Sequence, residues 1–140
     1  MTTLSLVGRT NYSPADEARM LAIGAAAINP PTERQERFYV DDLRRLVRSV
    51  VPVNGEPYQH TCTEENFTEI LYTIDELAVP FCVETLAKIA KVPLTQAAVA
   101  LAFLKERGCV VDAAKRLNKK ADAWVFEDGM VEYHALREKQ

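Results

Sequence analysis

Glycine is scarce in this chain of 140 residues, and the sequence motifs that depend on it are missing. Only five glycines occur, and none belongs to a GxGxxG dinucleotide fingerprint or to a phosphate-binding glycine loop. The serine-nucleophile motif GxSxG and the zinc-protease motif HExxH are missing as well. We therefore predict that the protein is not an enzyme and that it needs no cofactor.

Cysteine is equally sparse. The three cysteines, Cys62, Cys82 and Cys109, are far apart and odd in number, and none forms a CxxC pair. This pattern favours reduced, buried thiols in a cytoplasmic protein over a disulfide framework. His60 lies next to Cys62, but the other histidine, His134, is distant in sequence, and a zinc site needs three or four ligands. No metal site is predicted.

Long hydrophobic runs are missing too. The most apolar early segment, Met20–Ile28, is too short to span a bilayer, and no basic stretch leads into it as in a signal peptide. We expect a cytoplasmic protein with no membrane contact. The formal net charge of −3 argues against a general nucleic-acid coat, although an acidic protein can still carry a local basic patch.

Two helices are predicted in residues 1–60. Ser13 can cap a helix that continues to about residue 28, and Thr32 with Gln35 resembles a capping box for a second one. The second helix is predicted from apolar residues at helical spacing: Leu43, Leu46, Val47 and Val50. Whether Phe38–Val40 belongs to this helix or to an extended segment before it is left open. Residues 51–61 are predicted to form a loop.

Three further helices and a hairpin are predicted in residues 61–140. The first helix follows Thr63 with a regular apolar rhythm, the second covers Val83–Lys91, and the third ends at Gly108. The segments CVVDAA and AWVF are predicted as two strands joined by a charged hairpin. A last helix, capped by Asp128, is predicted to end the chain.

The segment TLAKIAKVPLTQAAVALAFLKERGCV resembles the second and third helices of a winged helix-turn-helix domain. LKERGCV is similar to the usual end of the third helix, and the hairpin after it would be the wing. The resemblance covers about residues 63–126. It implies an α+β fold, mostly α-helical, in which two additional N-terminal helices pack on a winged-helix-like half, all within one domain of residues 1–140.

The resemblance implies a small DNA-binding protein of the kind that regulates transcription, which would act as a dimer on double-stranded DNA. Its third helix would place Thr95 and Gln96 against bases or phosphates. The wing would hold the DNA backbone with four cations: Lys115, Arg116, Lys119 and Lys120. The alternative interpretation of these cations is a solvated hairpin tip, paired with nearby carboxylates.

The third helix is unusually apolar for a base-reading helix. Ala97, Leu101 and Leu104 are expected to face the core, which leaves a second apolar face formed by Val99, Ala102 and Phe103. Such a face is rarely left in water, so an N-terminal helix, the C-terminal helix or a partner chain is expected to cover it. The alternative function is therefore a non-catalytic protein-interaction or assembly module, which binds a protein partner or a second copy through these three residues.

Overall fold

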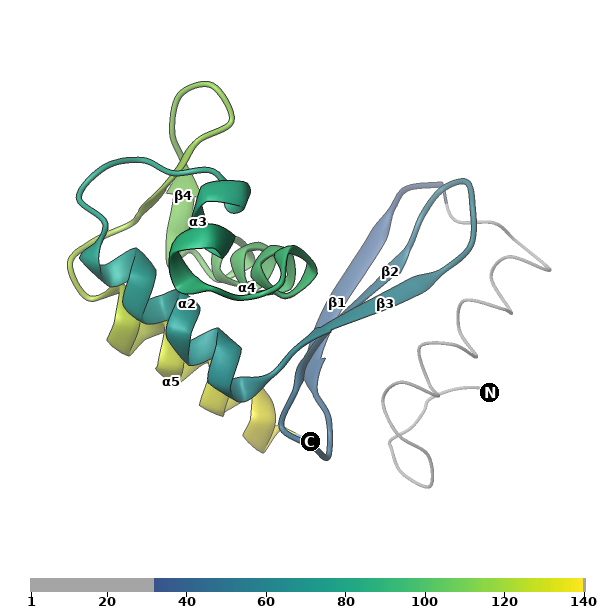
Figure 1. Cartoon of the computed structure of the whole chain (residues 1–140). Coiled ribbons are helices and arrows are strands. Elements are labelled where there is room, and N and C mark those ends of the chain that lie inside the picture. Colours follow the sequence, from purple (N-terminus) through teal and green to yellow (C-terminus); the bar gives the residue numbers. More distant parts are fainter. Residues whose placement is uncertain (1–31, 140) are drawn as a thin grey trace.

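The computed structural model describes residues 32–139, and the predicted helix over residues 14–28 lies outside the described residues. The described part contains four helices and five strands (Figure 1). In chain order these are β1 (Gln35–Val40), β2 (Leu46–Val51), β3 (Tyr58–Cys62), α2 (Glu64–Glu76), α3 (Val83–Ala90), α4 (Leu94–Glu106), β4 (Val110–Asp112), β5 (Asn118–Lys120) and α5 (Val125–Glu138).

The predicted fold class is wrong in its N-terminal half. The segment predicted as a second helix forms β1 and β2, and the segment predicted as a loop contributes β3. The three strands form an antiparallel sheet in the order β1-β2-β3. The described chain is therefore a mixed α+β fold, and no described helix precedes the sheet. β2 has the sequence LVRSVV, and its β-branched valines favour the extended backbone over a helix.

The turn between β1 and β2 is held by one aspartate. Oδ1 of Asp41 accepts hydrogen bonds from the backbone N–H of Leu43 (3.0 Å) and of Arg45 (2.9 Å). Arg44 adopts a left-handed backbone with φ of 63°, and the N–H of Asp41 donates to the carbonyl of Arg45 at 3.0 Å. This is a three-residue hairpin loop that ends in a left-handed residue, a common turn between antiparallel strands.

The predicted helix after Thr63 is confirmed. Oγ1 of Thr63 accepts a hydrogen bond from the N–H of Asn66 at 3.1 Å and so caps α2. The apolar residues of its regular rhythm are buried: Phe67, Ile70, Leu71 and Ile74. α5 packs along α2 (Figure 1). Gly129 permits this approach, because a Cβ atom there would lie 2.6 Å from Cδ2 of Leu71.

The hairpin after α4 exists, but its second strand was misplaced by the sequence prediction. β4 pairs with β5, and the predicted strand AWVF instead supplies the start of α5, with Trp124 at the N-cap. The reason lies in Asn118, which is buried and exchanges backbone hydrogen bonds with Phe81 (2.7 and 2.8 Å). This bridge fixes β5 next to the segment between α2 and α3.

Candidate functional site

The third helix, α4, lies where the sequence predicts it, and none of its long sides is fully open to solvent. Ala97, Leu101 and Leu104 are buried in the core as expected. Val99 and Phe103, the predicted partner contacts on the second face, each have an exposed fraction of 0%. Ala102 is partly buried. Both faces of α4 are therefore packed within the chain.

The sheet β1-β2-β3 covers the second face of α4. Strand register places Val40, Leu46 and Cys62 opposite one another on one face of this sheet, and all three belong to the same buried cluster as α4. The ring of Phe38 meets the ring of Phe103 edge-on, with the centroids 5.5 Å apart. The cover is thus a sheet of the same chain, and neither a helix nor a partner chain is needed to explain the apolar run of α4.

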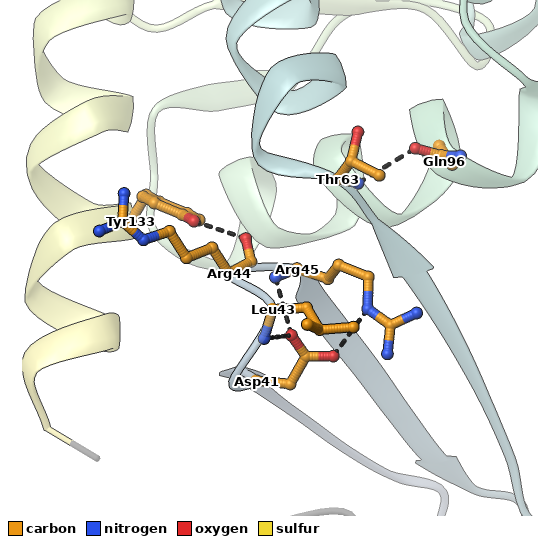
Figure 2. Close-up of polar contacts among 7 residues, drawn as sticks. All are labelled: Asp41, Leu43, Arg44, Arg45, Thr63, Gln96 and Tyr133. Atoms are coloured by element: carbon orange, nitrogen blue, oxygen red, sulfur yellow. Dashed lines mark hydrogen bonds and ion pairs between the residues drawn. The ribbon is translucent and has the colours of Figure 1, made fainter.

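One polar contact fixes the sheet to the start of α4 (Figure 2). Oε1 of Gln96 accepts a hydrogen bond from the backbone N–H of Thr63 at 3.1 Å and another from the side-chain amide of Asn66 at 2.7 Å. Gln96 was predicted to touch a base or a phosphate. Its side-chain oxygen is instead engaged at the junction between β3 and α2.

A second polar contact lies at the same end of the sheet, at the turn between β1 and β2 (Figure 2). The hydroxyl of Tyr133 on α5 donates to the backbone carbonyl of Arg44 at 2.6 Å, and the Arg44 guanidinium lies 3.7 Å from the carboxylate of Glu64. Burial raises the pKa of the Tyr133 hydroxyl to about 12. The hydroxyl therefore stays protonated and keeps its role as donor. Together with Gln96, this contact ties the sheet to three helices.

The only part of α4's first two turns that reaches solvent is a short strip beside the two packed faces, and it offers few hydrogen-bonding groups. Leu94 is 51% exposed, Thr95 is exposed, and Ala98 is half-buried. Of the two predicted DNA contacts on this helix, only Thr95 presents its side chain to solvent without an engaged partner in the described chain. A hydroxyl flanked by alanine and leucine can distinguish bases only weakly.

The tip of the β4–β5 hairpin presents two cations in a strained backbone. Lys115 and Arg116 are exposed and have φ angles of 55° and 67°. The N–H of Leu117 donates to the carbonyl of Ala114 at 3.1 Å and closes the turn. Two-residue turns with both φ angles positive favour Asn-Gly, because side chains with a Cβ are disfavoured there. The structure therefore holds Lys115 and Arg116 where smaller residues would be more stable.

Of the other two predicted hairpin cations, Lys119 is open to solvent and Lys120 is hydrogen-bonded within the chain. Lys119 is exposed. Nζ of Lys120 donates to the backbone carbonyl of Asp75 at 2.7 Å and so joins the hairpin to the end of α2. The predicted group of four phosphate contacts is thus reduced to three side chains at the surface.

The two buried thiols, Cys62 and Cys109, provide no reactive site. Burial raises the pKa of Cys62 to about 12 and that of Cys109 to about 11, whereas a reactive cysteine needs a lowered pKa. His60 lies on β3 and His134 on α5. Within residues 32–139, no group of three or more histidine, cysteine, aspartate or glutamate side chains could hold a metal ion.

No single helix in the described part of the chain is long and apolar enough to cross a membrane; α3 and α4 pass such a test only as a pair bent by 116°. The chain matches no protein-family model, no curated protein and no solved structure.

Proposed function

We propose that this protein is a non-catalytic protein-interaction or assembly module in which the third helix is structural. The observation that carries this proposal is the complete burial of Val99 and Phe103 on a helix that packs against β2 and β3. A helix that reads DNA must present a long side to the major groove. In this chain the side best placed to do so is occupied by β1, β2 and β3.

Opening that side for DNA would be costly. The sheet would have to leave Phe103 and Val99, and exposing each such side chain costs about 1.5–3 kcal/mol. Base contacts would have to offset this loss before any specific affinity appeared. Trp124 and Val131, each 64% exposed, lie seven residues apart along α5 and so toward one side of it, which supports contact with another protein instead.

The proposal is tested by recovering the chain under native conditions from the cells that encode it and measuring the mass of its complex by light scattering after nuclease treatment. A stoichiometric protein complex supports the proposal. A chain found only as a free monomer contradicts it.

The same purified chain is titrated with fluorescent DNA duplexes, both random and selected for binding, from low to physiological salt. We expect no duplex to be preferred by more than about tenfold, which corresponds to about 1.4 kcal/mol. A selected duplex that binds about a thousandfold better than random DNA, and loses this preference when Thr95 is replaced by alanine, would overturn the proposal.

A second candidate function is phosphate contact through the hairpin tip, and the strained turn favours it. Lys115, Arg116 and Lys119 are all exposed on the β4–β5 hairpin, so together they can neutralise phosphates without a base-reading helix. The double variant Lys115→Glu, Arg116→Glu should reduce the salt dependence of duplex binding by about two phosphate contacts. Lys139→Glu, an exposed cation at the end of α5, is the matched control and should change it little.

We further propose that the protein works in the cytoplasm. Support comes from the three cysteines, which are all free thiols in the described chain, as expected in a reducing compartment.

A further inference from the structure

β3 forms an open edge of the sheet. The strand order places β2 on one side of it, and no other strand in residues 32–139 pairs with its second side. The side chains of Tyr58, Gln59 and His60 are exposed, and Thr61 is half-buried. The outer edge of β3 is thus accessible over most of its length.

The register determines which backbone groups face outward from this edge. In an antiparallel ladder, hydrogen-bonded and non-hydrogen-bonded residue pairs alternate. The hydrogen bond from the N–H of Asp41 to the carbonyl of Arg45 makes this pair a bonded one, so the odd-numbered residues of β2 bond to β1. Even-numbered residues of β2 therefore bond to β3, through the pairs Leu46–Cys62, Arg48–His60 and Val50–Tyr58. The backbone groups of Gln59 and Thr61 consequently point away from the sheet. The next outward donor, the N–H of Thr63, is already bound by Gln96.

β3 lacks the charged side chains and the proline that often protect an edge strand, and its helix contacts are made with α4. Its sequence, YQHTC, contains no lysine, no other formally charged side chain and no proline, and these are the features that natural sheets use to prevent pairing with another chain. The opposite edge differs, because β1 carries the charged residues Glu36 and Arg37. The open, uncharged edge is therefore specific to β3.

We propose that β3 is a homodimer interface, in which the β3 strands of two copies pair antiparallel across a two-fold axis at His60. Gln59 then lies opposite Thr61 of the partner subunit, and Thr61 opposite Gln59 of the partner subunit. Each of these two pairs exchanges both of its outward backbone hydrogen bonds. The two three-stranded sheets become one continuous sheet.

The partner is a second copy because the edge is complementary to itself. Its two outward-facing residues are separated by one residue, so the two-fold arrangement places every outward donor opposite an acceptor. No like charges meet, since β3 carries no formal charge. The inference goes beyond the proposed function, because edge pairing does not depend on whether α4 can read DNA.

Sedimentation velocity of the full chain, over a concentration range from about 1 μM to 1 mM, tests the proposal. Gln59→Pro removes an outward donor and leaves the β2–β3 ladder bonds in place. Thr61→Lys places a charge at the edge and repels its own copy. Both variants should raise the dimer dissociation constant at least about tenfold. Ala135→Lys, on an exposed position of α5, is the matched control and should leave it unchanged.

Circular dichroism establishes that each variant retains the native fold. A wild-type chain that stays monomeric at the highest concentration would overturn the inference. So would a dimer whose dissociation constant is unaffected by both edge variants, or a β3 edge that pairs only with a different protein. A chain that is monomeric in sedimentation but is recovered from cells in a stoichiometric complex with a different protein would refute this inference and leave the proposed function standing. The two failures are therefore distinguishable.

Discussion

The substitution Phe103→Ala tests whether the second face of α4 is a structural core or a contact surface. The Phe103 ring is fully buried. It meets the rings of Phe38 and Phe67 edge-on at centroid distances of 5.5 and 6.0 Å, and the guanidinium of Arg107 lies 5.2 Å from its centroid. Its removal leaves a cavity at the junction of the sheet, α2 and α4.

The expected loss in the free energy of unfolding is about 3–5 kcal/mol, the usual cost of Phe→Ala in a well-packed core. A domain of this size has a stability of about 5–15 kcal/mol, so the variant should remain mostly folded at low temperature. Its melting temperature should fall by roughly 10–15 °C. A base-reading or partner-binding phenylalanine in solvent would instead change the stability by less than about 0.5 kcal/mol.

Urea unfolding followed by far-ultraviolet circular dichroism measures this difference. Phe103→Leu, which keeps most of the volume, provides a folded intermediate case with a loss of about 1–2 kcal/mol. Leu94→Ala, on the open side of the same helix, is the matched control and should change the stability little. A loss below about 1 kcal/mol for Phe103→Ala would refute the assignment of this face to the core.

Three further outcomes are expected from the polar contacts and the strained turn. Gln96→Ala should cost about 1–3 kcal/mol, because two donors lose their acceptor, whereas Thr95→Ala should be nearly neutral; urea unfolding of both compares them. Tyr133→Phe should cost about 1–2 kcal/mol. In addition, the wild-type chain should lose stability as the pH rises from about 10, where tyrosine ionises in the unfolded chain, to the folded pKa of about 12, since the folded state binds this proton more tightly. Between about pH 10 and 12, the free energy of unfolding of the Tyr133→Phe variant should therefore depend less on pH than that of the wild-type chain, as measured by urea unfolding at each pH. Replacing the turn residues by Lys115→Asn and Arg116→Gly should raise the melting temperature, through about 1–2 kcal/mol of relieved backbone strain; an unchanged or lower value would contradict the strain.

The helices of the C-terminal half were predictable because their signals are local. The rhythm of Phe67, Ile70, Leu71 and Ile74 specifies the buried side of α2, and Thr63 marks its start through the capping hydrogen bond that forms. Gly108 ends α4 with a φ of 79°, as the glycine predicted. Each of these features depends on side chains within a few residues of one another.

The sheet was not predictable from the same kind of pattern. Leu46, Val47 and Val50 satisfy a helical spacing, but Leu46 and Val50 also alternate along one face of a strand. Tertiary packing decides between the two, because Leu46 packs in the same buried cluster as α4. The loop between β1 and β2 contains no glycine. Its left-handed position is taken by Arg44, so the sequence carries no glycine to mark the turn.

The candidate site was misjudged for the same reason. The apolar run on α4 correctly indicated that something covers its second face. What covers it could not be inferred, since the covering strands were predicted as a helix and a loop. The side-chain oxygen of Gln96 accepts its hydrogen bonds from the N–H of Thr63 and the amide of Asn66. These two donors lie 33 and 30 residues earlier in the chain, so no local pattern could reveal them.

The placement of the sheet ahead of the helices that hold it has a consequence during synthesis. Arg44 leaves the ribosome 89 residues before Tyr133, its hydrogen-bond partner. At about 5–20 residues per second, the hairpin waits for several seconds before that contact can form. For most of this interval, until α4 (Leu94–Glu106) has also been synthesised, the apolar face with Phe38 and Leu46 has no helix α4 to cover it. The nascent chain should therefore depend on a chaperone, or on rapid elongation, more than the stability of the finished protein suggests.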